Sequence, residues 1–574
     1  MSAREDLMTE LDQDEQFYRD TESLAHPKLD DRQLAMLEPL GTRRLLQRGE
    51  LVYKAGQRDV GLTVVLRGTL EAFESRDGQD QIIGTIGPRN FAGDVAALTG
   101  TASVASVRGR DDQSEILVLE VPAGRLRQAL AELPGVSESI VRAFIMRRKR
   151  LQRDREFAGL RILAPEGSRE GRQLDDFLYK NHIPHRLIHS QSETGRGLSG
   201  RLHLSSSDLP ALITANGAPL RHPSLREVAR VAGLLRSVEV EREGEVTCDL
   251  AIIGAGPAGL AAAIYAASEG LKTVVLESFA PGGQAGASSL LENFFGFPTG
   301  ISGGDLTYSA QLQAYRFGAK FVTPAQALSL SFTEGGYGTI VQAEGCNASL
   351  RAKCTLIATG AEYRRLAAEG REDFEGTGVY YAATGREAQL CSGSSVIVAG
   401  GGNSAGQAAM FLSEHAAKVL LVIRGEDLAK SMSSYLARRV ETKGNIEILA
   451  RTEIRKMMGN KALEAVELED TQTHERRAIQ TPAVFSMIGA SPCTAWLPPE
   501  IECDEKGFIK TGRAVAAAPA WKGANRSPGP LETSRPGIFA AGDARSGSVK
   551  RCAAAVGEGG IAVAGVHEVL ASFA

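Results

Sequence analysis

The 574-residue chain has no closely spaced cysteines and no large net charge of either sign. Its seven cysteines stand at positions 248, 346, 354, 391, 493, 503 and 552, so no Cys-X-X-Cys pair offers a zinc knuckle or a redox dithiol. Lys and Arg number 65 against 69 Asp and Glu, a formal net charge of −4. This balance excludes a globally basic protein built to bind nucleic acid or an anionic membrane. Residues 1–16 lack the apolar core of a secretory signal, and we expect a cytoplasmic protein.

Long uncharged segments are also scarce. Residues 250–268 carry no charge and are long enough to span a membrane, but Ala and Gly dominate them rather than Leu. A buried strand, turn and helix is the better interpretation, and no membrane contact is expected. Glycine, in contrast, is abundant at 63 residues and has no collagen period, which predicts many tight turns.

The first 157 residues change character at about residue 29. Residues 1–28 are acidic and polar, and predict a flexible tail with room for one short helix. Residues 29–157 alternate short apolar strands with glycine turns, which predicts a small β-roll followed by helices near 123–132 and 138–157. The expected strands include 50–54, 62–66, 81–86 and 116–119.

The second of these helices is strongly basic. A basic helix is one way to contact nucleic acid, but no helix-turn-helix pattern follows it. We therefore expect a solvated face and no nucleic-acid partner. Its cations are Arg142, Arg147, Arg148, Lys149, Arg150, Arg153 and Arg155.

A compact α/β unit is expected over residues 158–240. Strands are predicted at 160–163, 185–188, 208–214 and near 218–220, and helices at 169–181 and 224–235. The Leu209-Pro210 step resembles the cis-proline of thioredoxin- or glutaredoxin-like proteins. That family places its dithiol in the loop after the first strand, yet residues 164–169 contain no cysteine, so we expect the fold without its thiol chemistry. The charged segment 236–246 predicts a linker, assigned to 241–247.

The most specific motif begins at Cys248. An apolar strand over 248–253 runs directly into Gly254-Ala255-Gly256-Pro257-Ala258-Gly259 and a helix of small residues, and the next strand, 272–276, ends in Glu277. In this arrangement the first glycine permits a tight turn, the second lets a pyrophosphate approach, and the third allows the helix to pack on the strand. The helix N-terminus faces the phosphates, and Glu277 is placed to accept hydrogen bonds from ribose hydroxyls. The segment predicts a dinucleotide site.

A second copy of the motif follows the strand at 395–399. It reads Gly400-Gly401-Gly402-Asn403-Ser404-Ala405, and its next strand ends in Arg424 rather than an acid. Arg424 and the nearby Lys430 would attract a 2′-phosphate, which favours NADPH over NADH. Because a further strand at 536–541 ends in Gly542-Asp543, the second fold is expected to lie between two parts of the first. Two dinucleotides in one chain indicate a flavin enzyme reduced by a nicotinamide.

From Asp249 to the end, the chain resembles thioredoxin reductases of the low-molecular-weight, bacterial type. The motifs are GAGPAGLAAAIYA at 254–266, GGQ at 282–284, ENFFGFP at 292–298, ATG at 358–360, GGGNSA at 400–405 and GIFAAGD at 537–543. The resemblance implies FAD and NADPH as cofactors and a homodimer. It also implies flavin contacts at Gly283, Gln284 and Asn293, and a ribityl or pyrophosphate contact at Asp543. Lys550 and Arg551 open the last helix, where cations would stabilise the anionic reduced flavin. The full set expected to bind the cofactors is Gly254, Gly256, Pro257, Ala258, Gly259, Glu277, Gly283, Gln284, Asn293, Thr359, Gly360, Gly400, Gly402, Asn403, Ser404, Ala405, Arg424, Lys430, Gly542, Asp543, Lys550, Arg551 and Cys552.

One departure from these reductases concerns their redox centre. The family carries Cys-Ala-Thr-Cys-Asp where this chain, aligned through 376–379, has Ala382-Ala383-Thr384-Gly385-Arg386. The nearest thiol, Cys391, is expected to be a small core residue. Without a dithiol, reduced flavin cannot pass electrons to thioredoxin by thiol exchange, so we assign no catalytic side chain and no metal. A quinone, a ferredoxin-like protein or oxygen is the expected acceptor. A ferredoxin–NADP reductase-type enzyme and a non-enzymatic redox or nucleotide sensor remain alternatives.

The N-terminal third resembles a cyclic-nucleotide-binding domain. Residues 91–98 match that family's phosphate cassette, but Asp94 is one methylene shorter than the usual Glu. The family's phosphate-binding arginine is replaced within Ala102-Ser103-Val104-Ala105 by the uncharged Ser103. Loss of a charge-assisted contact costs about 2–3 kcal/mol, or roughly 30- to 150-fold in affinity. We expect weak, altered or absent cyclic-nucleotide binding, which leaves a structural role, another small ligand or a partner surface.

The expected fold class is multidomain α/β plus a β-roll. Two dinucleotide-binding domains of the three-layer ββα type, one inserted in the other, follow the β-roll and the thioredoxin-like unit. The expected boundaries are 1–28, 29–157, 158–240, 241–247, 248–364 for the first part of the FAD domain, 365–492 for the NAD(P)H domain, and 493–574 for the second part of the FAD domain.

Overall fold

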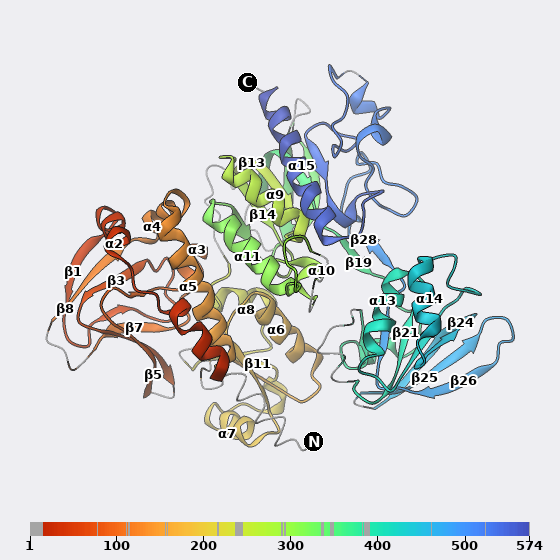
Figure 1. Cartoon of the computed structure of the whole chain (residues 1–574), viewed down its shortest axis with the longest axis horizontal. Helices are drawn as coiled ribbons and strands as arrows, with labels where there is room; N and C mark the ends of the chain where they lie inside the picture. The colour runs from red at the N-terminus through yellow and green to blue at the C-terminus, as the bar shows by residue number, and fades with distance from the viewer. Residues whose placement is uncertain are drawn as a thin grey trace.

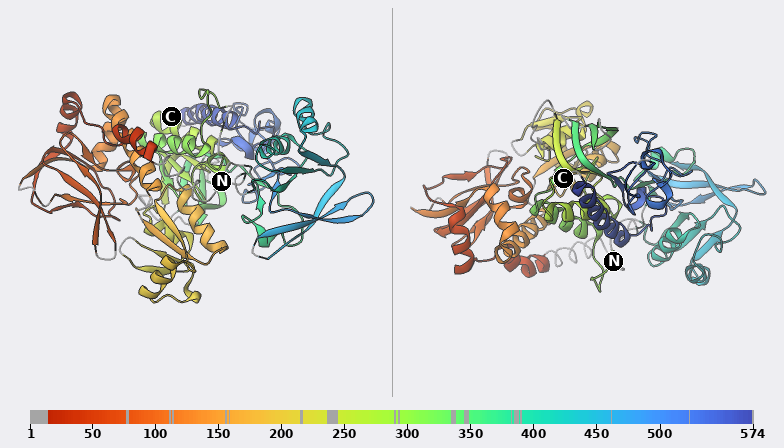
Figure 2. Two further views of the ribbon diagram at one scale, coloured as in Figure 1. Left: turned by 60° about the horizontal axis from the view of Figure 1, so that its bottom comes forward. Right: turned by 90° about the horizontal axis from the view of Figure 1, so that it is seen from above.

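Four modules make up the computed structural model (Figure 1). The β-roll and the second dinucleotide domain lie at opposite ends, and the first dinucleotide domain lies between them, next to the small α/β module (Figure 2). The structure describes residues 15–572 except 77–78, 111, 113–114, 155–156, 158, 215–216, 236–244, 289–290, 292–293, 334–337, 345–348, 382, 384–387, 389–390, 461 and 523.

The β-roll consists of two four-stranded sheets, as expected. Their strand orders are β1-β8-β3-β6 and β2-β7-β4-β5. The rings of Phe91 and Phe144 meet edge to face at 6.0 Å and join the roll to its long helix. The strands are β1 (Thr42–Leu46), β2 (Leu51–Tyr53), β3 (Leu62–Arg67), β4 (Leu70–Arg76), β5 (Gln79–Ile86), β6 (Phe91–Ala92), β7 (Ser106–Gly109) and β8 (Ile116–Val121). The helices are α2 (Asp31–Leu37), α3 (Val95–Thr99), α4 (Ala123–Glu132) and α5 (Pro134–Arg153).

The described part of the N-terminal segment contains the short helix for which the expected tail left room. Residues 15–25 are helical, and this helix packs on α5. The Tyr18 hydroxyl donates to the Arg150 carbonyl oxygen at 3.0 Å, and the Arg153 guanidinium lies 4.0 Å from the centre of the Phe17 ring. The tail was predicted from its acidic and polar composition. In the structure its aromatic rings and Glu22 contact cations of the basic helix.

The cations of α5 are largely engaged inside the chain rather than on a solvated face. Arg147 donates to backbone carbonyls of Ala25, Phe91 and Gly93, and Lys149 pairs with Asp305 at 2.6 Å. Arg155 lies outside the described residues. The basic run is therefore an intramolecular interface for most of its length.

The small α/β module has the strand order β10-β9-β11-β12. β10 (His185–His189) is parallel to β9 (Leu160–Ala164), while β11 (Ala211–Ile213) and β12 (Pro219–Arg221) are antiparallel to their neighbours. The Leu209-Pro210 peptide before β11 is cis. The helices are α6 (Arg169–Lys180), α7 (Glu193–Arg201) and α8 (Leu225–Val231). The sequence did not predict α7 because its nine residues include three glycines.

The first dinucleotide domain is built on a seven-stranded sheet. Its parallel part is β15 (Lys320–Val322), β14 (Thr273–Leu276), β13 (Glu245–Ile253), β18 (Ser349–Ile357) and β29 (Ile538–Ala540), and the hairpin of β16 (Gln326–Phe332) and β17 (Thr339–Glu344) pairs with the first half of β18. The helices are α9 (Pro257–Ser268), α10 (Gly283–Gly286), α11 (Gly303–Arg316) and α15 (Cys552–Ala571). Because β29 joins the sheet of β13, the second domain is an insertion in the first.

Two details of this domain differ from the sequence analysis or add to it. β13 begins at Glu245, so residues 245–247 belong to the strand rather than to the expected linker 241–247, and 236–244 lie outside the described residues. Among the described helices, α15 alone is long and apolar enough to cross a membrane by length and composition. It packs along α9, where a Cβ on Gly559 would come within 2.3 Å of the Ala258 carbonyl oxygen.

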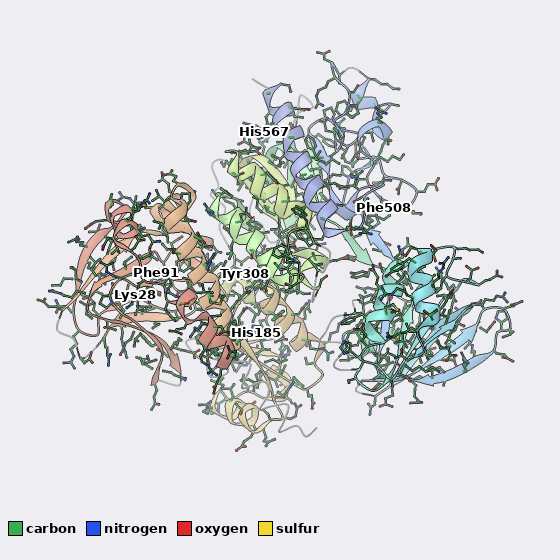
Figure 3. All side chains as sticks on the ribbon, viewed as in Figure 1. Lys28, Phe91, His185, Tyr308, Phe508 and His567 are labelled. Carbon is green, nitrogen blue, oxygen red and sulfur yellow. The ribbon has the colours of Figure 1, made fainter. Side chains whose placement is uncertain are left out.

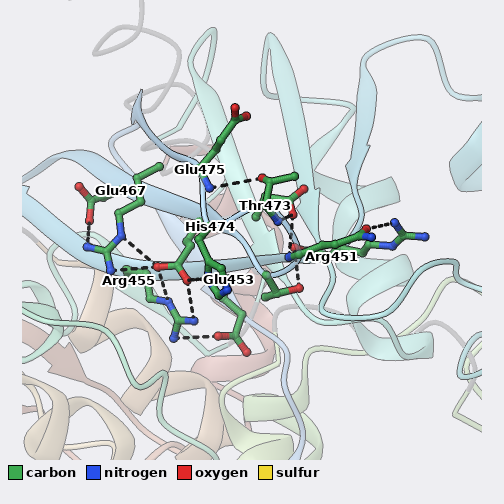
Figure 4. Close-up of polar contacts among 12 residues, drawn as sticks. Arg451, Glu453, Arg455, Glu467, Thr473, His474 and Glu475 are labelled. Carbon is green, nitrogen blue, oxygen red and sulfur yellow. Dashed lines mark hydrogen bonds and ion pairs between the residues drawn. The ribbon is translucent and has the colours of Figure 1, made fainter.

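The second dinucleotide domain carries a parallel five-stranded sheet in the order β20-β27-β21-β22-β23. A separate antiparallel sheet, β24-β25-β26, holds the ion-pair cluster drawn in Figure 4. A two-stranded ribbon of β19 (Ala361–Tyr363) and β28 (Ala490–Pro492) connects this domain to the first. The remaining elements are β20 (Val379–Tyr380), β21 (Ser395–Ala399), α13 (Asn403–Leu412), β22 (Lys418–Val422), α14 (Ser434–Thr442), β23 (Ile446–Leu449), β24 (Thr452–Gly459), β25 (Leu463–Asp470), β26 (Arg476–Gln480) and β27 (Val484–Ser486).

Candidate functional site

The site expected for FAD lies where three parallel strands of the first domain end. β13 leads into Gly254, β18 into Thr359-Gly360, and β29 into Gly542-Asp543. The carboxyl ends of parallel strands share one edge of a sheet, and this edge is where open α/β sheets bind ligands. The fold therefore gathers three segments that are up to about 290 residues apart along the chain.

Gly254 of the first motif occupies a position that residues with a side chain could not. Gly254 has a φ of 101°, and a Cβ there would lie 2.4 Å from the Ala358 carbonyl oxygen. Gly256 and Gly283 approach each other, since a Cβ on Gly283 would lie 3.0 Å from the Gly256 Cα. The Gly282 N–H donates to the Ala255 carbonyl oxygen at 2.8 Å. The GAGPAG loop and the GGQ segment thus form one backbone cradle.

Glu277 lies at the end of β14, next to this cradle. Its buried carboxylate accepts the N–H groups of Ala255 at 2.8 Å and of Phe279 at 2.9 Å. Burial raises the pKa of Glu277, although these N–H donors oppose the shift. The acid predicted to bind ribose therefore also fixes the loop that faces the phosphates.

The remaining predicted flavin contacts differ in how much the structure shows of them. Gln284 lies in α10, and its side-chain amide donates to the Ala361 carbonyl oxygen. The buried Oγ1 of Thr359 has no hydrogen-bond partner among the described residues. Gly360 has a φ of 68°, and Asn293 lies outside the described residues.

The start of α15 completes the edge. α15 runs parallel to α9, and their far ends are joined by a 2.7 Å contact between His567 and Glu269 (Figure 3 labels His567). Both helix N-termini therefore point to the same crevice, where the free N–H groups favour an anion. Pro257 and Ala258 open α9, and Arg551 caps α15 directly before Cys552.

Charged groups surround the N-terminus of α15. The Lys550 ammonium donates to the Asp543 carbonyl oxygen and lies 4.4 Å from the centre of the Phe508 ring. Burial raises the pKa of Asp543 and lowers that of Lys550. The sequence analysis missed Glu558, which accepts the Gly542 N–H at 2.7 Å and pairs with Arg545. The sequence feature that could have predicted this role is an acid between two glycines in the first half of a largely apolar helix.

The second motif forms the corresponding turn in the second domain. Gly400 has a φ of 139°, and a Cβ there would lie 2.3 Å from the Met487 carbonyl oxygen. Ser431, which was not predicted, donates to the Gly401 carbonyl oxygen at 2.8 Å, and Asn403 accepts the Ser433 N–H at 2.7 Å. Ser404 is exposed at the start of α13, Ala405 is buried against the sheet, and Gly402 is the helix N-cap.

Arg424 and Lys430 lie on the loop after β22. Both side chains are exposed, and the described residues offer neither of them an ion pair. A backbone hydrogen bond fixes this loop, because the Arg451 N–H donates to the Gly425 carbonyl oxygen at 2.9 Å. Two cations are thus available to an anion beside the second glycine turn.

Comparison with known proteins places this geometry in a family. Residues 248–559, more than half of the chain, match the pyridine nucleotide-disulphide oxidoreductase family. The chain belongs to this family. Residues 43–132 match the cyclic nucleotide-binding domain.

Similar proteins cover the same part of the chain. The thioredoxin reductase of Treponema pallidum is 33% identical over 318 residues, which are 55% of this chain and 95% of the relative. The 34.2 kDa protein in the rubredoxin operon of Clostridium pasteurianum is 32% identical over 320 residues, 55% of this chain and 96% of the relative. The crystal structure of T. acidophilum thioredoxin reductase, 28% identical, covers 58% of this chain and 100% of its own, with a TM-score of 0.48.

The residues of this oxidoreductase fit the two cofactors of its thioredoxin-reductase-like members, FAD and NADPH. The backbone cradle at Gly254 and Gly283 has no space for a side chain on either residue, and Thr359 presents a buried hydroxyl that lacks a partner. An N–H-rich cradle with an unsatisfied hydroxyl suits a pyrophosphate-containing ligand. The free cations after β22 suit a 2′-phosphate.

The cyclic-nucleotide-binding module departs from a nucleotide site. Asp94 caps α3 with one carboxylate oxygen, and its other oxygen pairs with Arg148 at 2.9 Å. The hydroxyl of Ser103, which replaces the family's phosphate-binding arginine, donates to the Ala105 carbonyl oxygen at 2.8 Å. A Cβ on Gly233, which follows α8, would lie 2.4 Å from the Ala102 nitrogen, so the small α/β module covers this loop.

The cysteines do not supply a thiolate. The six described cysteines, all but Cys346, form no disulfide bond. Burial raises the pKa of Cys354 to about 12 and of Cys493 to about 11, and also raises the pKa values of Cys248, Cys503 and Cys552. Cys391 lies in the core of the second domain, 2% exposed. Raised pKa values leave these thiols protonated and poorly nucleophilic at neutral pH.

Proposed function

We propose that this oxidoreductase takes a hydride from NADPH onto FAD and delivers the electrons to an acceptor that is not a disulfide relayed through its own dithiol. The observation that carries the proposal is two complete glycine turns in a chain whose sequence contains no Cys-X-X-Cys pair. Relatives named thioredoxin reductase reduce thioredoxin. By the resemblance through residues 376–379, we expect Ala382 and Gly385 in place of the two cysteines of that family.

The first domain supplies binding and orientation. FAD, when bound, supplies the hydride-accepting and electron-releasing chemistry. Gly254, Gly256 and Gly283 let the backbone approach the pyrophosphate, and Thr359 offers the hydroxyl that lacks a partner inside the protein. Asp543 and the N-terminus of α15 lie beside the same loop, since a Cβ on Gly542 would lie 3.2 Å from the Ala258 Cβ at the start of α9. No protein nucleophile is required, because hydride transfer between two cofactors needs only stacking and orientation.

The second domain is proposed to select NADPH. Arg424 and Lys430 stand where an acid would otherwise bind the ribose hydroxyls of NADH. Their exposure and their lack of ion pairs among the described residues leave both cations available to a 2′-phosphate. Charge-assisted contacts of this kind contribute about 1.5–3 kcal/mol each.

The small α/β module is proposed to be a thioredoxin-like domain without redox chemistry. Its strand order and the cis peptide before β11 support this assignment. The loop from β9 to α6 ends in Ser168, whose hydroxyl caps the helix by accepting the Gly171 N–H at 3.0 Å. A capping serine thus occupies the region where thioredoxins carry a thiol.

Anaerobic titration and acceptor assays test the proposal. The purified protein should be yellow, and NADPH should bleach its flavin band without any added thiol. Under steady-state conditions a quinone or ferricyanide should be reduced much faster than oxidised thioredoxin. A colourless protein that takes up no added FAD contradicts the cofactor assignment, and efficient thioredoxin reduction contradicts the acceptor assignment.

A variant with a restored dithiol sharpens the acceptor test. Ala382→Cys combined with Gly385→Cys recreates the relatives' Cys-X-X-Cys spacing. The single change Ala382→Cys is the matched control, because one thiol cannot form the intramolecular disulfide. If thioredoxin reduction appears only in the double variant, the missing dithiol is the cause of the altered acceptor choice. If the wild type already reduces thioredoxin, and does so as fast as the double variant, the proposal is wrong.

A further inference from the structure

Arg148 joins the β-roll module to the small α/β module at one buried point. Its side chain is 3% exposed and pairs with Asp94 of the β-roll at 2.9 Å. A second guanidinium nitrogen donates to the His182 carbonyl oxygen, in the small α/β module, at 3.3 Å. We propose that Arg148 is a positioning residue that couples the cassette of the β-roll, residues 91–98, to the flavin-binding segment through α11. This inference rests on the proposed binding of FAD at Gly283 and Gln284.

The coupling begins with the Asp94–Arg148 pair. Asp94 Oδ1 accepts the Ala96 N–H at 2.7 Å and so begins α3, while Oδ2 faces Arg148. The pair lies inside the protein, where removing one partner leaves an uncompensated charge. The position of the cassette helix and the position of the α5 guanidinium are therefore set together.

His182, which accepts from Arg148, also contacts the first dinucleotide domain. Its ring stacks on that of Tyr308 in α11, with centroids 3.7 Å apart and an interplanar angle of 25°. Figure 3 places Tyr308 where α11 faces α5, and Phe91 on the opposite side of α5, within the β-roll. Burial, helped by the nearby Arg148, lowers the pKa of His182 to about 3, so the stacked ring is neutral. Tyr308 itself is buried within a core that the β-roll module shares with the first dinucleotide domain.

Two further contacts hold α11 against the β-roll helices. Lys149, the neighbour of Arg148, pairs with Asp305 in the first turn of α11 at 2.6 Å. The Arg316 guanidinium, in the last turn, donates to the Leu130 carbonyl oxygen of α4 at 2.7 Å. Since both ends and the middle of α11 are attached, the helix cannot move without the β-roll helices.

α11 in turn supports the GGQ segment. A Cβ on Gly303 would lie 1.8 Å from the Ala285 carbonyl oxygen, and a Cβ on Gly282 would lie 2.9 Å from Thr307 Oγ1. The Gly303 N–H also donates to the Ser288 carbonyl oxygen at 2.9 Å. With no free space between α10 and α11, a shift of α11 displaces Gly283 and Gln284, the proposed flavin contacts.

The test compares two arginines of one helix. Arg148→Met removes the buried junction, whereas Arg142→Met removes an equal charge from α5 at an exposed side chain that pairs with Glu138 one turn away. We expect Arg148→Met to weaken FAD binding about tenfold, as measured by quenching of flavin fluorescence. We also expect the visible circular dichroism and midpoint potential of its bound flavin to change, which loss of stability alone would not do. Arg142→Met should match the wild type in all three measurements.

A double variant guards against simple misfolding. Asp94→Asn with Arg148→Met removes both charges and should recover folded protein, because no buried charge remains unpaired. It should retain the altered flavin spectrum, since the junction is still absent. Wild-type protein that binds no FAD overturns the proposed function. Wild-type protein that binds FAD with the same affinity, spectrum and potential as the folded Arg148 variants overturns only this inference.

Discussion

Gly259 lies so close to Gly254 that a Cβ on Gly259 would stand 1.9 Å from the Gly254 carbonyl oxygen. The first turn of α9 is thereby packed directly onto the end of β13. The same contact brings the helix N-terminus to the sheet edge where Thr359 and Asp543 lie. We therefore expect the affinity of this domain for its cofactor to depend on the absence of a methyl group at Gly259.

Replacement of this glycine gives the first prediction. Gly259→Ala forces α9 away from β13, so FAD affinity should fall by at least about tenfold, a loss of 1.4 kcal/mol or more. Gly124→Ala is the control, because Gly124 lies in helix α4 and a Cβ there meets no atom within 4 Å. Equal retention of FAD by the two variants during gel filtration would contradict the packing argument.

The second prediction concerns the choice of nicotinamide. Arg424→Leu should raise the KM for NADPH by about tenfold or more and leave the KM for NADH almost unchanged, because only NADPH carries the 2′-phosphate. Arg438→Leu, an exposed arginine of α14 in the same domain, controls for the general loss of positive charge. A parallel rise in both KM values would show that Arg424 does not discriminate between the two nucleotides.

The third prediction is a pH dependence in the β24–β26 sheet (Figure 4). The Glu469 carboxylate accepts from His474 at 3.2 Å, Arg455 at 3.3 Å and Arg476 at 2.9 Å. These contacts, that from His474 first, hold the pKa of Glu469 below its usual 4.5. The stability contributed by the carboxylate is therefore present above about pH 4.5 and is lost as the pH falls through the lower native pKa.

Thermal unfolding of Glu469→Gln checks this direction. The variant should have a lower Tm than the wild type at pH 7, and the difference should shrink as the pH falls below about 4. Glu475→Gln changes an exposed acid in the connection between β25 and β26 and should show no such pattern. A difference in Tm that stays constant with pH would rule out the ion pairs as its source.

The fourth prediction concerns the β-roll. Because Asp94 is committed to Arg148 and the Ser103 hydroxyl to Ala105, cyclic AMP or cyclic GMP at about 1 mM should not raise the Tm of the protein. Adenosine 5′-monophosphate at the same concentration is the control for non-specific effects. A rise in Tm specific to the cyclic nucleotide would mean that the ligand displaces one of these internal contacts.

The sequence was most informative where local patterns determine the structure. The strands before Gly254 and Gly400, the helices after them and the return of Gly542-Asp543 to the same domain all follow from short motifs whose spacing has a geometric reason. The β-roll strands were also predicted, since glycine turns separate short apolar segments. Positions that require a positive φ, such as Gly254, are visible as glycines in the sequence itself.

Contacts between residues that are distant in the sequence could not be derived in the same way. Asp94 and Arg148 are 54 residues apart, and both resembled parts of other patterns, a nucleotide cassette and a basic helix. Lys149 and Asp305 lie in different modules, so their pairing depends on how those modules pack. Helix α7 was missed because its glycines disfavour a helix locally, although its N-cap Ser192 is a recognisable start.

The crevice of the first dinucleotide domain is built from both ends of the insertion, with β13 and β18 before it and β29 and α15 after it. During synthesis the ribosome therefore releases a complete second domain while the first is still missing a strand and a helix. α9 is synthesised well before α15, so its apolar face stays uncovered until α15 has been made. Loss of α15 would therefore leave α9 uncovered and the sheet edge incomplete, although α15 is only 20 residues long.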